Sequence, residues 1–99
     1  MWSDPPPGFT WNPAKAAQNV AKHDVAFDEA ATVFDDPEIR VRSDDLHTWD
    51  EDRLIATGQS VAGRLLTVSY TMQGEATRII SSWPATPQAV RSYREGDDD

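Results

Sequence analysis

The spacing of apolar residues changes near residue 38, and this change limits the fold more than any other feature of the chain. Before it, apolar residues recur every three or four positions, whereas from Ile39 to Trp83 they mostly alternate with polar ones. The first spacing indicates amphipathic helices and the second indicates half-buried strands. Helices followed by a run of strands predict an α+β domain in which the helices cover one face of a small sheet.

Two short helices are expected near the N-terminus, over residues 12–23 and 27–34, after a short strand at 9–11. Asn12 is a good N-cap, and Pro13 suits the first helical position because the N–H it lacks would have no partner there. In the second segment, apolar residues stand at positions 27, 30, 31 and 34. Asp28 and Glu29 lie in its first turn, where the helix dipole favours negative charge.

Four strands are expected at 38–43, 53–60, 64–72 and 77–83, with Gly63 and Gly74 available for the turns. Strands joined in this way predict a twisted antiparallel meander. A closing helix follows over 86–96, because Thr86 can cap it, Pro87 suits its first position and Gly96 can end it. The chain is therefore expected to comprise an irregular Pro-rich start (1–8), one domain (9–95) and an acidic tail (96–99).

Charge is distributed unevenly along the 99 residues, whose net charge is −8. Residues 24–52 contain eleven acidic residues and two Arg, whereas residues 53–94 contain five Arg and a single Glu. The overall sign disfavours a nonspecific nucleic-acid binder. The pattern has two interpretations, either ordinary charge that keeps the protein soluble or a local cationic surface that meets a polyanion.

The absence of Cys excludes a disulfide framework and thiolate metal sites, and it is compatible with a cytoplasmic location. No apolar run is long enough to span a membrane, so no membrane partner is expected. The start "MWSDPPPGF" lacks the basic and apolar regions of a secretory signal.

Three stretches of the chain resemble one family, the BrnT toxins of bacterial type II toxin–antitoxin pairs. They read "FTWNPAKAAQNVAKHDVAFDEAATVFDDP", "HTWDEDRLIATGQSVAGRLLTVSYT" and "TRIISSWPAT…SYREG". The family pattern runs roughly W-D/N-P-x-K-A-x-x-N-x-x-K-H-x-V-x-F-x-E-A, then H-x-x-x-E-x-R-x-x-x-x-G, then R-I-I-S. The resemblance implies a RelE-like fold, RNA cleavage that stops translation, and a tight complex with a BrnA-type antitoxin.

Metal-free RNA cleavage needs a base for the 2′-hydroxyl, fixed cations for the phosphate and a proton donor for the leaving 5′-oxygen. The two His stand far apart in sequence and form no metal-ligand motif, so neither a metal nor another cofactor is expected. The candidate catalytic residues are His47, Glu51, Arg53, Arg78 and Tyr93, and the candidate RNA-binding residues are Arg64, Arg91 and Trp49.

The resemblance places His47, Glu51 and Arg53 at the three positions of the H-x-x-x-E-x-R pattern, and Arg78 at the start of R-I-I-S. An imidazole suits acid–base work near neutral pH, and a guanidinium grips a phosphate through a planar fork. Simpler interpretations stay open. His47 could be a solvated loop residue, and Glu51 and Arg53 could pair with each other at the start of the strand. Arg78 could be an outward-facing strand residue, and Tyr93 could belong to the core.

Three other residues are interpreted structurally or depart from the family. His23 is expected to stabilise the C-terminus of the first helix, and Trp11 is expected to be a buried anchor. Trp83 stands where the family often has Arg, and the last helix lacks much of the usual positive charge. The alternative function is therefore a catalytically degenerate toxin-like scaffold. Its acidic 24–52 region would mimic nucleic acid and inhibit a nucleic-acid-binding protein.

Overall fold

The structure is a computed structural model that describes residues 5–44 and 52–96. The elements follow the chain as β1 (Phe9–Thr10), α1 (Pro13–His23), α2 (Phe27–Thr32), a 3-10 turn η1 (Val33–Asp35), β2 (Arg40–Ser43), β3 (Arg53–Gln59), β4 (Leu65–Gln73), β5 (Ala76–Pro84) and α3 (Pro87–Glu95). The α+β class is confirmed. The second helix ends earlier than expected, because its last turn tightens into η1.

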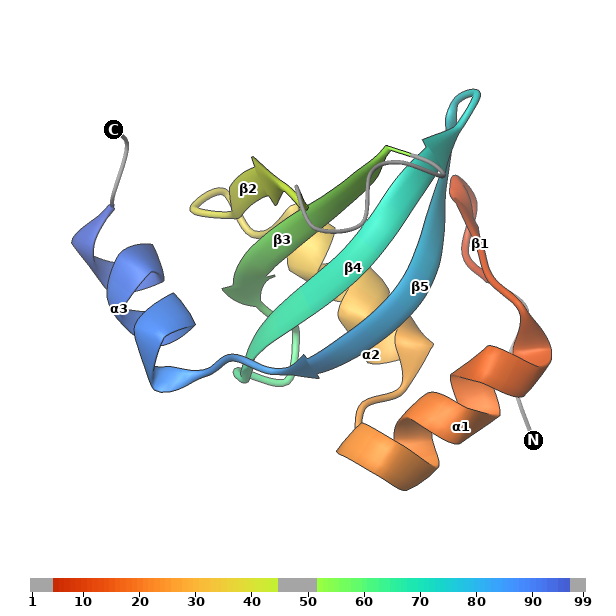
Figure 1. The fold of residues 1–99 in the computed structure, drawn as a ribbon, viewed down its shortest axis with the longest axis horizontal. Coiled ribbons are helices and arrows are strands. Elements are labelled where there is room, and N and C mark those ends of the chain that lie inside the picture. Colours follow the sequence, from red (N-terminus) through yellow and green to blue (C-terminus); the bar gives the residue numbers. More distant parts are fainter. Residues whose placement is uncertain (1–4, 45–51, 97–99) are drawn as a thin grey trace.

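The five strands form one sheet in the order β1-β5-β4-β3-β2 (Figure 1). The predicted antiparallel meander is confirmed for β2 to β5. The expectation of a wholly antiparallel sheet is wrong, because β1 pairs with β5 in parallel, Phe9 beside Thr77. A parallel pair needs a long crossover, and here α1, α2 and three strands lie between the two partners in sequence.

α1 and α2 cover one face of the sheet, and the hydrophobic core lies between them and the strands. Leu66, Val68 and Ile79 of the sheet and Phe27 of α2 are almost completely buried there. Trp11, expected to be a buried anchor, is half-buried and packs edge-on against Phe27, with ring centroids 5.6 Å apart. Leu66 and Val68 of β4 therefore pack into this core, on one face of the strand, as their alternation indicated.

Asn19 fixes α1 on the sheet. Its Nδ2 donates to the carbonyl oxygens of Val25 and Ser82, each at 2.8 Å, and its Oδ1 accepts from the Ser82 N–H at 3.1 Å. Asn19 is only 5% exposed, and Ser82 is completely buried. Since buried polar groups without partners are costly, these three bonds set the position of α1 along β5.

α3 does not join the other helices, which corrects the expectation that the helices share one face. It lies apart from α1 and α2 (Figure 1), and a hollow lined by residues of α3 and of the opposite face of the sheet lies beside it. Thr86 caps it through Ala89 N–H at 3.2 Å, and Gly96 ends it at φ 64°. None of the helices in the described ranges is long and apolar enough to cross a membrane.

Candidate functional site

The sheet face opposite α1 and α2, here called the polar face, carries hydroxyl and guanidinium side chains. Side chains that are paired across neighbouring strands point to the same side. One row of paired residues joins Arg42, Ile55, Ser69 and Ser81, the next joins Arg40, Thr57, Thr67 and Trp83, and a third joins Arg53, Thr71 and Arg78. Thr57, Thr67, Ser69 and Thr71 are all buried, so this face has a polar floor rather than a solvated surface.

Arg53 and Arg78 share a row on the polar face, because both pair with Thr71, one from each side. Two strand spacings separate their Cα atoms, about 10 Å. Thr71 Oγ1 donates to the Asp52 carbonyl at 2.7 Å, which fixes the chain next to Arg53. Asp44 adjoins Arg53 at the end of β2, where its N–H donates to the Arg53 carbonyl at 3.0 Å. The row thus brings together two of the predicted catalytic residues.

A bulge in β5 puts Arg78 on the polar face. Ser69 pairs with Ser81, but the next residue of β4, Tyr70, pairs with Ile79, so β5 contains one extra residue at Ile80. In a regular strand, side chains alternate between faces, and Arg78 would point to the opposite side from Trp83. The extra residue reverses this alternation and places both side chains on one face.

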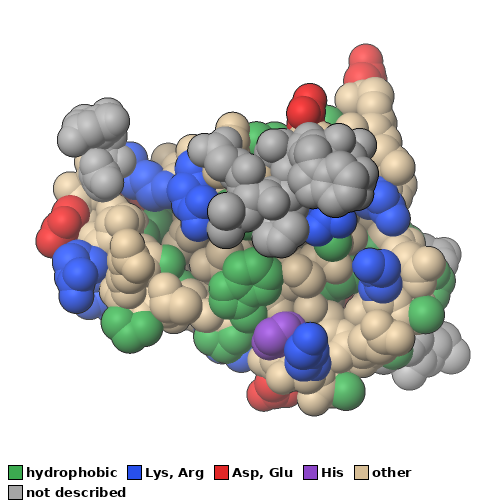
Figure 2. All heavy atoms as spheres, viewed as in Figure 1, with side chains coloured by type: hydrophobic (Ala, Val, Ile, Leu, Met, Phe, Trp, Pro, Cys, Tyr) green, Lys and Arg blue, Asp and Glu red, His purple; other side chains and the backbone are tan. Residues whose placement is uncertain are grey.

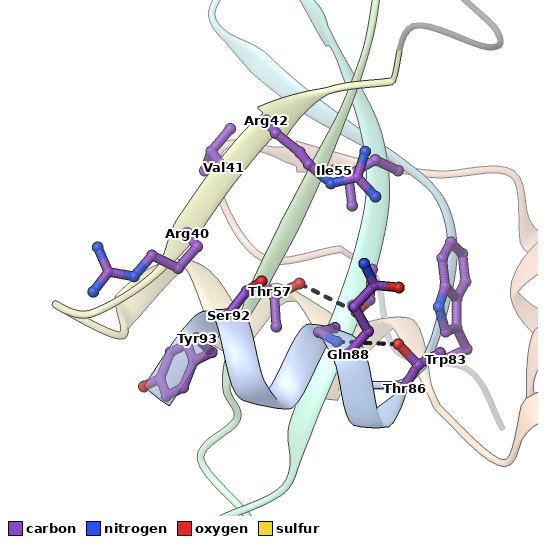
Figure 3. Close-up of a pocket in the computed structure, with 12 residues that line it drawn as sticks. Arg40, Val41, Arg42, Ile55, Thr57, Trp83, Thr86, Gln88, Ser92 and Tyr93 are labelled. Atoms are coloured by element: carbon purple, nitrogen blue, oxygen red, sulfur yellow. Dashed lines mark hydrogen bonds between the residues drawn. The ribbon is translucent and has the colours of Figure 1, made fainter. Parts of the chain in front are cut away.

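A hollow of about 420 Å³ lies between the polar face and α3. Among its lining residues are Arg42, Thr57, Trp83, Gln88 and Ser92. The described residues that line it include no Asp or Glu. Figure 3 shows Arg42 and Trp83 on opposite sides of the hollow with Gln88 between them, while the guanidinium of Arg40 points away. The hollow therefore combines positive charge, hydrogen-bonding groups and an aromatic ring.

The same distribution of charge is visible over the whole polar face. Figure 2 shows Lys and Arg side chains across this face and Asp and Glu side chains toward its rim. Two carboxylates of the acidic 24–52 region are used within the protein: Glu29 pairs with Arg64, and Asp36 accepts three hydrogen bonds. Among the residues that the structure describes, positive side chains therefore gather on this face and carboxylates lie toward its edge.

Tyr93 lines the hollow, but its hydroxyl is engaged. Its Oη donates to Asp36 Oδ2 at 2.6 Å, and this bond raises the pKa of Tyr93 to about 12. Partial burial would raise the pKa of Asp36, but hydrogen bonds from Tyr93 and from the N–H groups of Gln59 and Glu38 outweigh it and lower that pKa. The bond ties α3 to the end of η1, and this geometry favours the docking role over proton donation.

Two of the predicted RNA-binding residues lie elsewhere. Arg64 is on the helical side of the sheet, where its Nη2 pairs with Glu29 at 2.6 Å and also donates to the Asp24 carbonyl. The hydrogen bond from Arg64 lowers the pKa of Glu29. Arg91 is exposed on α3 and does not line the hollow, because Gln88 and Ser92 occupy the inner side of that helix. The structure does not bring either residue to Arg53 and Arg78.

Comparison with known proteins decides the family. Residues 11–88 match the family model described as "Ribonuclease toxin, BrnT, of type II toxin-antitoxin system". The chain belongs to the BrnT family. The fold also resembles the crystal structure of the Brucella abortus ribonuclease toxin BrnT, at 23% identity and a TM-score of 0.62, covering 79% of this chain and 95% of that one. A comparison with curated proteins gave no match.

Family membership makes this chain a ribonuclease toxin of a type II toxin–antitoxin system, a class that acts with an antitoxin partner. His47 and Glu51, which the BrnT resemblance marks as site residues, and Trp49, expected to bind RNA, lie outside the described residues. Within the described ranges, no group of three or more His, Asp or Glu side chains is placed to hold a metal ion. The roles of all the predicted site residues stay predictions.

The glycine of the BrnT pattern H-x-x-x-E-x-R-x-x-x-x-G has a structural reason here. This residue is Gly58 on β3, and a Cβ at this position would lie 2.9 Å from Val33 Cγ1 and 3.2 Å from Asp36 Oδ2. Only a residue without a side chain allows η1 to approach β3 so closely. Asp36 is thereby placed to accept from Gln59 N–H at 2.7 Å and from Tyr93.

The sequence interpretation did not include Arg42 and Trp83 among the site residues of this BrnT family member. A signal for Arg42 was available, because it alternates with Val41 on β2 and so points away from the apolar side. Trp83 was treated only as a departure from the family. Its position between α3 and the end of α1 depends on pairings that the sequence does not reveal, including the ring contact with His23 at 6.2 Å.

Proposed function

We propose that this protein cleaves RNA on the polar face, holding the scissile phosphate between Arg53 and Arg78, and that a BrnA-type antitoxin inhibits it by covering that face. The observation that carries the proposal is the shared row of these two residues on either side of Thr71. Guanidinium groups are permanently charged and can donate two parallel hydrogen bonds to a phosphate.

In the proposed reaction, the 2′-oxygen attacks the adjacent phosphorus and the bond from phosphorus to the 5′-oxygen breaks. A base takes the proton of the 2′-hydroxyl, and an acid supplies a proton to the leaving oxygen. Arg53 and Arg78 stabilise the extra negative charge on the phosphoryl oxygens, which in comparable sites contributes about 3–4 kcal/mol per donor. The proton transfers are assigned to His47 and Glu51 by the family resemblance alone.

The high pKa of Tyr93 bears on the choice of acid. A group is an effective acid–base catalyst when its pKa is near the working pH, and the bond to Asp36 moves Tyr93 to about 12. We therefore assign Tyr93 to the docking of α3 and leave the acid and base to the other predicted residues. We also place the reaction in the cytoplasm, where the messenger RNA of a bacterium is translated.

The experiment compares purified wild-type protein with Arg53→Ala and Arg78→Ala on single-stranded RNA without added metal. Wild type should cleave, and each variant should be slower by about 10²- to 10³-fold. Arg94→Ala is the control, because Arg94 is an exposed residue of α3 that does not line the hollow. Adding purified BrnA-type antitoxin should abolish cleavage.

The competing function is an acidic module that mimics nucleic acid. Asp28, an exposed carboxylate of the acidic 24–52 region, lies on α2 and so on the helical side of the sheet, away from the polar face. A wild-type protein that cleaves no RNA and arrests no growth on induction, but binds a basic protein in a salt-sensitive way, would contradict the nuclease proposal and support the module.

A further inference from the structure

Trp83 lines two hollows rather than one. On one side it faces the hollow between the polar face and α3, together with Arg42 and Gln88. On the other side it lines a second hollow of about 300 Å³ between α1 and β5. The ring is half-buried, and its centroid lies 6.2 Å from that of His23, with the two planes at 50°. The indole therefore forms a wall shared by both hollows.

The second hollow is also basic. Lys15, Gln18, Lys22 and His23 line it from α1, at positions that fall on one side of a helix. The residues that line it in the described part of the chain include no Asp or Glu, and α1 itself contains no acidic residue. Asn19, which also lines it, is occupied by its bonds to Val25 and Ser82. The two Lys are exposed and available to a ligand.

We propose that this α1 hollow and Trp83 form a second subsite for a single-stranded RNA, in which a base next to the cleavage site stacks on Trp83 and a neighbouring phosphate binds Lys15 and Lys22. The inference rests on the proposed function, since it extends the same substrate beyond the Arg53–Arg78 row. It also gives the Trp that replaces a family Arg a role in binding.

The chemistry favours a single strand over a duplex. Proteins that bind single strands combine a positive groove with aromatic side chains on which unpaired bases stack. In a duplex the faces of the bases are covered by their neighbours, so an indole on the wall of a groove has nothing to stack on. Two basic hollows joined by one indole therefore match a flexible chain of phosphates and bases.

The test measures the binding of a fluorescently labelled single-stranded octanucleotide with 2′-O-methyl groups, which cannot be cleaved because it has no free 2′-hydroxyl. Trp83→Leu should weaken binding by about tenfold, whereas Trp83→Phe should keep most of it because it retains a ring. Lys15→Ala and Lys22→Ala should each reduce the slope of log Kd against log salt by about 0.7. Arg94→Ala, which removes one exposed charge outside both hollows, should leave the salt slope unchanged.

Thermal unfolding of each variant keeps the outcomes distinct, because it reports whether Trp83→Leu still folds. Lys22→Ala tests the same hollow at an exposed position, where a loss of folding is not expected. If wild type cleaves RNA and Arg78→Ala does not, but Trp83→Leu and Lys22→Ala bind as wild type does, the subsite is wrong and the nuclease proposal stands. Equal affinity for a duplex of the same length would also overturn it. A wild-type protein that neither binds nor cleaves RNA overturns both.

Discussion

Arg53 and Arg78 are 25 positions apart in sequence but occupy the same row of the sheet, one on each side of Thr71. Each is half-buried, and both side chains stand on the polar face. Thr71 fills the space between them with a side chain that is already hydrogen-bonded to the backbone. The proposed phosphate site therefore has one arginine on each side of a threonine whose hydroxyl is already hydrogen-bonded.

The first prediction concerns the shape of the cation at position 78. Arg78→Lys keeps the charge but loses the planar fork, so RNA binding should keep its salt dependence while the cleavage rate falls by about tenfold or more. The measurement is single-turnover cleavage of a short RNA, with Arg94→Lys as the control. A Lys variant that cleaves at the wild-type rate would show that a point charge is sufficient and that the fork plays no part.

The second prediction separates structural from RNA-binding arginines. Arg64→Ala removes the ion pair with Glu29 and the bond to the Asp24 carbonyl. Because the Arg64 side chain is 39% exposed, solvent screening limits the loss to about 1 kcal/mol of unfolding free energy. Cleavage should be unchanged. Denaturant titration and RNA cleavage check the two parts, and a variant of normal stability that cleaves poorly would restore Arg64 to the RNA site.

The third prediction concerns the close approach at Gly58. Gly58→Ala should lower the free energy of unfolding by about 1–3 kcal/mol, because the new methyl group would meet Val33 Cγ1. Combining it with Val33→Ala removes the opposing atom, so the double variant should be less unstable than the sum of the single ones by at least about 0.5 kcal/mol. Denaturant unfolding of the four proteins gives the coupling. Strict additivity would mean that the steric contact is not the cause.

The fourth prediction follows from the bond between Tyr93 and Asp36. A Tyr pKa raised from 10.0 to about 12 means that the bond's contribution to stability is complete below pH 10 and is lost as the pH rises to 12. Asp36 acts in the opposite direction: its lowered pKa stabilises the fold above its ordinary value of 3.8, and this contribution is lost as the pH falls below that value.

Tyr93→Phe removes the hydroxyl and should lower the free energy of unfolding near pH 7 by about 1 kcal/mol, since the bond is only partly shielded from water. Its stability should also change less than that of wild type between pH 10 and 12. Ultraviolet titration of tyrosine ionisation checks the pKa, with the variant reporting Tyr70 alone, whose pKa is raised by burial. A variant with the wild-type alkaline profile would contradict the assignment.

Much of the fold could be predicted because local signals agreed with the final packing. Asn12 and Thr86 cap their helices as expected, through bonds to Ala14 N–H at 2.8 Å and to Ala89 N–H at 3.2 Å. The alternation along β4 correctly separated Leu66, Val68 and Tyr70 from the hydroxyl side chains. These features depend on neighbours in sequence, which is why a single chain reveals them.

The features that could not be predicted depend on partners far away in sequence. The parallel pairing of β1 with β5 has no local signal, and neither does the pairing of Arg64 with Glu29. To predict the site, one would also have to know that β5 contains an extra residue. With strict alternation from Trp83, the Arg78 side chain would point toward the helices. The family resemblance identified Arg78 as a site residue, but the bulge explains how it reaches Arg53.

The attachment of the first elements to the last strand also governs when the molecule can assemble. Asn19 and Ser82, which hold α1 on the sheet, are 63 positions apart. Ser82 belongs to β5, and β1 also pairs with β5. β5 is the last strand of the sheet in chain order, so until it has been synthesised the chain lacks both its complete core and the second arginine of the row. The core and the Arg53–Arg78 row are therefore completed by the same strand.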